Sequence, residues 1–302
     1  MDSAEGRPGA AGGGQGAAVI AEDFGVRGPR GWAFRQVRID APPGTVVAIE
    51  GPSGSGRTCL LLALTGRMRP SEGRAEVGGL ALPRAMAAVR RIAALGHVPG
   101  VSELDPALTV EEHLRERALL RRRFGQSPRA LLRPRALLHP RAERAERAAE
   151  SRDRIAGALA AAGLDTAALP KGGRTRADDL ERLEALRLHV ALALIGRPRL
   201  LAMDDVDLKL SDSDRAEVWR LLRSVAERGT TVLAVCSQAP GDTETVVLLK
   251  EAVRLKEAVR EEAVLLEKGH GEGHTEADAN KPDAEHDSRK ETADALAETR
   301  RA

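Results

Sequence analysis

The sequence predicts an α/β fold with a mainly parallel sheet, and three observations support this. Strand-like and helix-like segments alternate over residues 18–250, a pattern typical of α/β proteins. Short continuous apolar runs at 46–49, 200–203 and 231–235 resemble parallel strands buried on both faces. A Gly-rich loop follows the first run directly, and a helix-like apolar segment follows the loop. We expect a last strand at 246–249.

Composition limits the protein class. Apolar residues make up 42% of 302 residues, enough for a sizeable core, but aromatic residues make up only 2%, so the core must be aliphatic. The formal net charge of +2 favours no particular partner. No apolar run approaches the length of a membrane span, and the N-terminus lacks the features of a secretory signal. We therefore expect a cytoplasmic protein, in which Cys59 and Cys236 are reduced, buried thiols.

The sequence divides into three parts. Residues 1–17 are rich in Gly and Ala, and we expect a disordered leader there. Residues 18–250 form the predicted globular domain. The last part, 251–302, begins with a repeated Glu-Ala-Val motif that predicts a helix, and it continues as a polar, acidic segment that we expect to be disordered.

An Arg-rich insertion lies at about 115–154, with 13 arginines against 5 acidic residues. Pro128, Pro134 and Pro140 recur at a six-residue spacing. Because proline breaks a helix interior, we expect an irregular segment or short helices throughout the insertion. Its basic face could approach anionic lipid headgroups or acidic loops of a partner, or the insertion could be a solvated loop without a partner. Both interpretations stay open.

The Gly-rich loop matches the Walker A pattern GxxxxGK followed by Ser or Thr, except that Arg57 replaces the lysine. Such a loop closes backbone N–H groups around phosphate oxygens at a helix N-terminus, and its hydroxyl can hold Mg²⁺. The predicted phosphate-binding residues are Gly51, Ser53, Gly54, Ser55, Gly56, Arg57, Thr58 and Cys59. Arginine keeps the charge but replaces a compact ammonium with a planar fork. We therefore expect weakened phosphate binding and a greater loss of transition-state stabilisation.

Two carboxylates follow the apolar run at 200–203, as in a Walker B motif. We expect Asp204, at the end of a strand neighbouring that of the P-loop, to hold Mg²⁺ together with Thr58. Asp205 would take the position of the carboxylate that orients the attacking water. Arg57 and Asp205 are therefore the candidate catalytic residues. The alternative is a buried strand that ends in a solvated Asp pair.

These motifs, in this order, resemble the ABC ATPase family, the ATP-binding domains of ABC transporters within the P-loop NTPases. Leu108–Leu114 is similar to the family's LTVxENL segment, Val190–Leu201 to the helix that leads into Walker B, and Leu210–Asp214 to the D-loop. The resemblance covers about 18–250. It implies a mainly parallel core sheet, an antiparallel β edge, a helical subdomain that contains the Arg-rich insertion, and ATP and Mg²⁺ as ligands. Phe24 would be the aromatic residue that stacks on adenine, with Trp32 as a rival.

Several family residues involved in catalysis are replaced. Gly100 stands in place of the Q-loop glutamine, and Leu180–Glu184 keeps only the leading Leu of the LSGGQ signature. Asp205 is one methylene shorter than the usual Glu, and Ser237 replaces the switch histidine. Together with Arg57, these changes argue against a fast ATPase and leave open whether the chain is an enzyme.

The resemblance implies a nucleotide-binding subunit that forms a homodimer, or a heterodimer with another cassette, and acts with a separately encoded membrane permease. Such a subunit would bind Mg-ATP with weak or no hydrolysis, and would lie at the inner face of the cell membrane through the permease. One alternative is a non-enzymatic regulatory or scaffolding pseudo-ATPase. A nucleic-acid-associated ABC protein is less favoured, because Phe124 is the single aromatic residue of the insertion.

Overall fold

Two β-sheets account for the strands of the computed structural model, which describes residues 16–29, 31–124 and 141–249. One is an antiparallel, four-stranded sheet with the order β2-β1-β4-β5. The other is a parallel, five-stranded sheet with the order β6-β7-β8-β3-β9. The antiparallel strands are β1 (Val19–Gly28), β2 (Gly31–Ala41), β4 (Glu72–Val77) and β5 (Leu80–Leu82). The parallel strands are β3 (Val46–Glu50), β6 (Ala93–Leu95), β7 (Leu200–Met203), β8 (Thr231–Cys236) and β9 (Thr245–Leu248).

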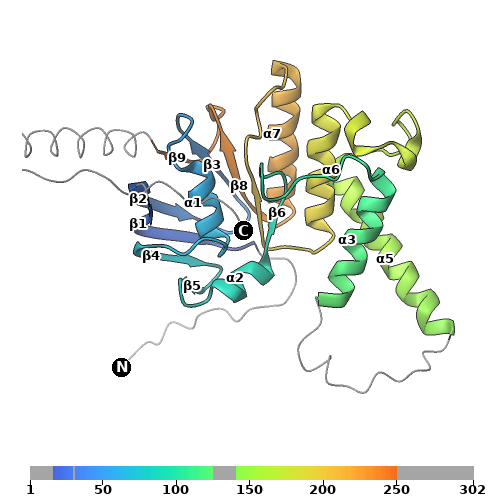
Figure 1. Cartoon of the computed structure of the whole chain (residues 1–302), viewed down its shortest axis with the longest axis horizontal. Coiled ribbons are helices and arrows are strands. Elements are labelled where there is room, and N and C mark those ends of the chain that lie inside the picture. The colour runs from blue at the N-terminus through green and yellow to red at the C-terminus, as the bar shows by residue number, and fades with distance from the viewer. Residues whose placement is uncertain (1–15, 30, 125–140, 250–302) are drawn as a thin grey trace, which may run out of the picture. The chain divides into compact units, whose positions relative to one another are not determined.

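This arrangement confirms the α/β class and the mainly parallel sheet. The four strands predicted from apolar runs are β3, β7, β8 and β9, and each boundary agrees within one residue. The antiparallel part is a separate sheet (Figure 1). One detail of the prediction is wrong, because β8 lies between β7 and β3. The strand that ends at the two aspartates is therefore not the direct neighbour of the P-loop strand.

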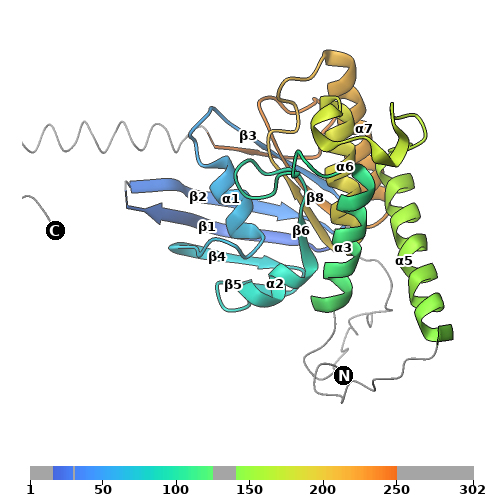
Figure 2. The same cartoon turned by 45° about the vertical axis from the view of Figure 1, so that its right-hand side comes forward.

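The helices separate into two groups around the parallel sheet (Figures 1 and 2). Helix α1 packs on the side of the antiparallel sheet, whereas α3, α5, α6 and α7 contribute to a second core. The helices are α1 (Arg57–Leu64), α2 (Met86–Ile92), α3 (Val110–Phe124), α5 (Arg141–Ala162), α6 (Arg182–Leu194) and α7 (Asp212–Glu227), with 3₁₀ turns at Gly172–Arg174 and Ala177–Asp179. Helices α3, α5 and α6 contact one another and form the helical subdomain.

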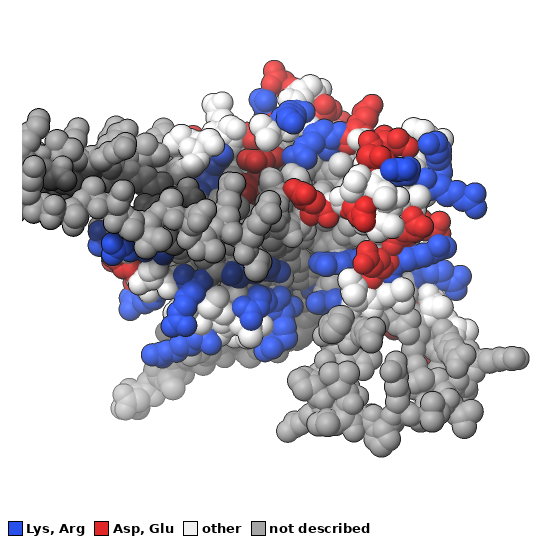
Figure 3. Space-filling model, in the orientation of Figure 1, with Lys and Arg blue, Asp and Glu red and all other residues white. Residues whose placement is uncertain are grey.

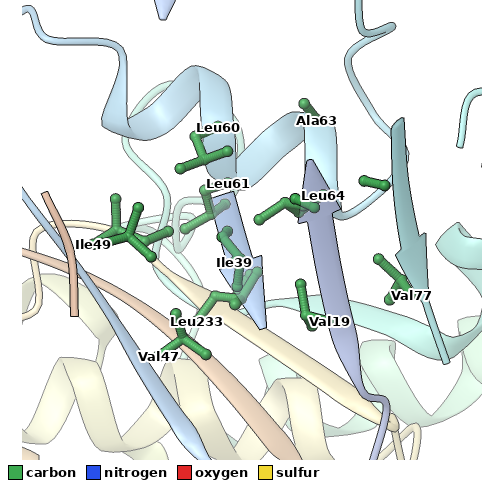
Figure 4. Close-up of a cluster of buried hydrophobic side chains, with 14 of the residues drawn as sticks. Val19, Ile39, Val47, Ile49, Leu60, Leu61, Ala63, Leu64, Val77 and Leu233 are labelled. Atoms are coloured by element: carbon green, nitrogen blue, oxygen red, sulfur yellow. The ribbon is translucent and has the colours of Figure 1, made fainter. Parts of the chain in front are cut away.

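Helix α1 is buried between the two sheets. Leu60, Leu61 and Leu64 are fully inaccessible to solvent, and Figure 4 shows them between side chains of β1, β2 and β4 and side chains of β3 and β8. Burying each leucine contributes about 1.5–3 kcal/mol relative to leaving it exposed. The direction of α1, and hence of the loop before it, is therefore set by packing on both sides.

The parallel strands distribute their side chains between two cores. Leu200 and Ala202 of β7 join the core around α1, whereas Leu201 and Met203 join the core of α3, α5, α6 and α7. This alternation follows from the two-residue period of a strand. Both faces are apolar, which explains why the runs in the sequence are continuous.

The prediction for the Arg-rich insertion was wrong at both ends. Its first residues continue α3 as far as Phe124, and α5 begins at Arg141. Pro128, Pro134 and Pro140 all fall within 125–140, outside the described residues. The flanking segments contain no proline, so nothing prevents them from forming long helices.

The predicted termini lie mostly outside the described residues. Residues 1–15 of the expected leader are not described, but Ala17 is fully buried and its N–H donates to the carbonyl of Arg199 at 3.0 Å. Gly16 and Ala17 therefore belong to the fold. The predicted tail at 251–302 lies beyond the last described residue, Leu249.

Across the described ranges, no helix is both long and apolar enough to cross a bilayer. On the face shown in Figure 3, acidic and basic side chains are mixed over the helical side, and basic side chains predominate over the region of β4, β5 and α2. Some charges join elements directly. Arg35 pairs with Glu72 at 2.9 Å, and Arg187 of α6 pairs with Glu217 of α7.

The rings of two histidines, His97 and His189, lie close to each other in the interior. His189 of α6 is 6% exposed, and its ring lies 4.9 Å from that of His97, centroid to centroid. Burial, with lesser contributions from His97, Arg182 and His113, lowers the pKa of His189 from 6.5 to about 3. The imidazole is therefore neutral in the folded protein at pH 5, whereas it is protonated in the unfolded chain.

This difference predicts a pH-dependent stability. Below pH 6.5 the unfolded state binds more protons than the folded state, so stability falls as the pH is lowered toward 3. Between pH 6 and 5, the unfolding free energy of the wild type should fall by up to about 1.4 kcal/mol more than that of His189→Leu. Urea unfolding at each pH measures both values, and parallel pH curves for the two proteins would contradict the assignment.

Candidate functional site

The loop between β3 and α1 is built for close approach of a ligand to its backbone. Gly54 and Gly56 have φ angles of 79° and 92°, values that residues with a Cβ adopt at a cost. A Cβ on Gly56 would lie 2.2 Å from the carbonyl oxygen of Ala33, whereas a Cβ on Gly54 would meet no atom within 4 Å among the described residues. The loop ends at the N-terminus of α1, where unpaired N–H groups and the helix dipole favour an anion.

The predicted loop residues differ in accessibility. Ser53 and Gly54 are exposed, and Gly51, Thr58 and Cys59 are half-buried. Ser55 is different, because it is fully buried and its N–H donates to the carbonyl of Pro52 at 3.1 Å. As the loop stands, Ser55 stabilises the turn, and its N–H could bind phosphate only if the turn opened.

The loop and the end of β7 are joined by a short hydrogen bond. The hydroxyl of Thr58 donates to Oδ2 of Asp204 at 2.5 Å. The second carboxylate oxygen, Oδ1, accepts the N–H of Asp205 at 2.9 Å. Asp204 is 3% exposed, and burial raises the pKa of its carboxyl group. A hydroxyl beside a carboxylate, completed by phosphate and water oxygens, is a donor set that suits Mg²⁺.

Arg57 extends across the site to the ends of two strands. Its Nη1 donates to the carbonyl oxygen of Cys236, the last residue of β8, at 2.7 Å. Its Nη2 lies 3.8 Å from Oδ1 of Asp205, and the Arg57 side chain is 14% exposed. Asp205 itself has a φ of 48°, a left-handed conformation that is uncommon outside Gly, Asn and Asp. The two candidate catalytic residues therefore contact each other.

The prediction for Phe24 was wrong. Its side chain is fully buried, and its ring lies 5.9 Å from that of Phe34 in the core, so neither face is open to a base. Trp32, the rival, is half-buried, with the guanidinium of Arg35 4.7 Å from its ring centroid. A Cβ on Gly25 would lie 3.3 Å from the Trp32 ring. Phe24 is thus a core residue, and Gly25 leaves room for the ring of Trp32 to pack against the backbone.

The residues that replace the family motifs have roles within this chain. Gly100 is exposed in a turn, where its N–H donates to Glu103 Oε1 at 2.8 Å. Glu181 and Glu184 form a capping box at the start of α6, so both carboxylates are bound to their own helix N-terminus. The N–H of Ser237 donates to Oδ2 of Asp207 at 2.8 Å.

Three groups near the site were missed by the sequence reasoning. Asp207 is 7% exposed and holds the turn after β8 through the N–H groups of Ser237 and Gln238. Nη2 of Arg182 donates to the carbonyl of Asp205 at 3.3 Å. The carbonyl of Cys236 could not be found from side-chain patterns. For Asp207 the signal was present, as a third aspartate two residues after Asp205.

Neither Cys59 nor Cys236 forms a disulfide. Cys236 is buried, as expected, and burial raises the pKa of its thiol to about 12. Cys59 is only half-buried, which corrects the expectation for that thiol. In residues 16–29, 31–124 and 141–249, no cluster of three or more His, Cys, Asp or Glu side chains is arranged to hold a metal ion.

A parallel sheet, a glycine loop that leads into a helix, and a buried aspartate bonded to the loop hydroxyl define a P-loop NTPase fold. The profile of the ABC transporter family matches residues 34–207. The chain therefore belongs to the ABC transporter family, among the ATP-binding cassettes.

Several relatives have related sequences. The chain is 31% identical over 191 residues to Nod factor export ATP-binding protein I of Paraburkholderia xenovorans, a match that covers 63% of this chain and 53% of that protein. It is 35% identical to Daunorubicin resistance ATP-binding protein DrrA3 of Streptomyces coeruleorubidus, over 63% and 51% of the two chains. It is 32% identical to Fe(3+) ions import ATP-binding protein FbpC of Pseudomonas fluorescens, over 68% and 51%. The chain spans about half the length of these curated relatives.

Solved structures share the fold. A dimeric ATP-binding cassette in a post-hydrolysis state, bound to ADP and Pi, aligns with a TM-score of 0.56 and 21% identity, over 78% of this chain and 95% of that one. A part of the cbiONQ ABC transporter complex of Clostridium perfringens aligns with a TM-score of 0.58 and 19% identity, over 85% and 98%.

The geometry of the loop predicts unequal effects of alanine at its two glycines. Gly54→Ala should cost about 1–2 kcal/mol, because only the left-handed conformation opposes it. Gly56→Ala adds a clash with the Ala33 carbonyl, and should cost roughly 1–3 kcal/mol more. Urea unfolding of the two variants tests this difference, and equal losses would show that the loop relaxes around Gly56.

Proposed function

We propose that the chain is the ATP-binding subunit of an ABC transporter, and that it binds Mg-ATP at the P-loop with weak or no hydrolysis. The observation that carries this proposal is the 2.5 Å hydrogen bond between Thr58 and Asp204 at the N-terminus of α1. It brings the two expected metal ligands together from positions 146 residues apart. The glycine loop beside them offers the backbone approach that phosphates need.

Each part of the site has a separate task in this proposal. Backbone N–H groups of the loop and the first turn of α1 hold phosphate oxygens. Thr58 and Asp204 hold Mg²⁺, which neutralises phosphate charge when bound. Trp32, near the start of β2, offers the ring on which adenine stacks, because its side chain is half-buried whereas Phe24 is inaccessible.

The same residues account for slow turnover. The carboxylate of Asp205 is one methylene shorter than glutamate and lies beside Arg57, and a displacement near 1 Å costs roughly 100-fold in rate. Ser237 carries no imidazole that could hold a phosphate or a proton. Gly100 has no amide side chain for the metal or the water. These features support binding over hydrolysis.

The family supports a dimer of cassettes and a separately encoded membrane permease as partners. The names of relatives describe ATP-binding proteins of export and of import systems, so we propose transport without choosing a direction. The chain would then lie in the cytoplasm, peripheral to the inner face of the membrane through the permease. A role with nucleic acid is not part of this proposal.

A second candidate is a non-enzymatic regulatory or scaffolding cassette that has lost nucleotide binding. The contacts of Arg57 with Cys236 and Asp205 favour it. Through these contacts the charged side chains of the site bind to other groups of the protein and not to a nucleotide. The two candidates differ in one measurable property, the affinity for Mg-ATP.

Calorimetry of Mg-ATP binding to the full chain tests the proposal. We expect binding to the wild type, at least tenfold weaker binding to Asp204→Asn, because a charged metal ligand is lost, and weaker binding to Trp32→Ala, because stacking is lost. Asp212→Asn is the control, since this exposed carboxylate of α7 forms an ion pair with Arg215 three residues further along the same helix. An absence of binding to the wild type at millimolar Mg-ATP would sink the proposal and leave the scaffolding cassette.

A further inference from the structure

The ring of Trp32 is contacted by a side chain that is itself anchored on another strand of the antiparallel sheet. The guanidinium carbon of Arg35 lies 4.7 Å from the centroid of the Trp32 ring, within the range of a cation–π interaction. The same guanidinium donates to both carboxylate oxygens of Glu72 on β4, from Nε at 2.9 Å and from Nη2 at 3.2 Å. The position of Arg35 over the ring is therefore fixed by Glu72.

Gly25 makes this arrangement possible. Strand β1 lies between β2 and β4, so Arg35 has to cross β1 to reach Glu72. Gly25 is the residue of β1 that pairs with Glu72, and a glycine within a strand allows other groups to approach closely. A Cβ at this position would lie 3.3 Å from Cζ3 of Trp32 and 3.4 Å from Cα of Arg35. A larger side chain would therefore displace the ring or the neighbouring strand.

Two arginines lie over the indole, and they are held differently. The side chains of Arg35 and Glu72 are 37% and 32% exposed, and a bidentate pair that is partly shielded holds its geometry better than an exposed single contact. Arg27 is exposed, and its guanidinium carbon is 5.8 Å from the same centroid. Arg35 is thus the anchored cation, and Arg27 is the one that an incoming ring can displace.

Trp32 also lies near the P-loop. Its neighbour Ala33 directs its carbonyl oxygen at Gly56, where a Cβ would lie only 2.2 Å away. Strand β2 therefore contacts the end of the loop one residue after Trp32. Because Trp32 is the second residue of β2, next to the end of the β1–β2 hairpin, its ring depends on side-chain contacts for a fixed orientation.

We infer that Arg35, anchored by Glu72 across Gly25, is a positioning residue for the base of the nucleotide. It holds the indole of Trp32 in the orientation in which a purine stacks on it. The inference rests on the proposed function, in which adenine stacks on Trp32. The guanidinium of Arg35 occupies one face of the indole and leaves the other face to the base. A ring that is ordered before binding loses less conformational entropy when the base arrives.

Calorimetric titration of the full chain with Mg-ATP and with Mg-tripolyphosphate tests this inference. Tripolyphosphate presents phosphates to the loop but has no base, so the ratio of the ATP affinity to the tripolyphosphate affinity reports the stacking. Arg35→Ala should lower this ratio by about three- to tenfold, because an unfixed ring must then be ordered on binding. Glu72→Gln should lower it by a smaller factor, since the amide retains only part of the contact with Arg35.

A double variant shows whether Arg35 acts through Trp32. Trp32→Ala should lower the ratio by about tenfold or more, because the stacking platform is lost. Arg35→Ala added to Trp32→Ala should lower it little further, since the two residues act as one unit. Independent, additive effects of the two substitutions would overturn the inference.

Arg38→Ala is the matched control. It removes an arginine and an ion pair, that with Asp23 at 3.2 Å, from the same strand as Arg35. It should leave the ratio unchanged, which separates the loss of positive charge from the loss of the ring contact. Equal losses of affinity for both ligands in Arg35→Ala, or a rise in the ratio, would overturn the inference while the phosphate site survives. Failure of the wild type to bind either ligand would overturn the proposed function as well.

Discussion

The burial of α1 between two sheets is the constraint on which the site depends. The antiparallel sheet covers one side of this eight-residue helix, and the parallel sheet covers the other. Because Leu60, Leu61 and Leu64 fill the space between them, the helix cannot turn without exposing apolar surface. Its N-terminus is thereby directed at the carboxyl ends of β7 and β8, and the loop that precedes it is placed beside Asp204.

This placement explains how distant substitutions can act together. Position 57 belongs to α1, position 205 follows β7, and position 236 ends β8. Each would be judged separately in a comparison of motifs, as a lost lysine, a shortened glutamate and an ordinary cysteine. In the folded chain they form one hydrogen-bonded and charged unit. Two of the residues that replace catalytic residues of the family therefore contact each other in the fold. A comparison of motifs does not show this contact.

The family membership and the local contacts suggest different aspects of function. The family indicates a cassette that acts in a dimer with a permease, whereas the contacts describe the charge balance of a single chain. Glu181 and Glu184 illustrate the difference. In the alignment with the signature they are misplaced negative charges, but within the chain they cap α6, a favourable position for acidic side chains.

The sequence by itself determined the fold class, the four parallel strands with recognisable apolar runs, the P-loop and the aspartate pair, because these are local patterns of residue type and spacing. It did not determine the role of Phe24, since an aromatic residue near a loop can face the core or the ligand, and only packing decides which. It also did not determine the partner of Arg57, because that partner is a backbone carbonyl that leaves no trace in residue type. The insertion was mistaken for a different reason, because prolines at 128–140 were taken to break helices over the whole of 115–154, whereas the segments on either side of them are helical. Tertiary structure decided these points, because they depend on which surfaces are buried against one another.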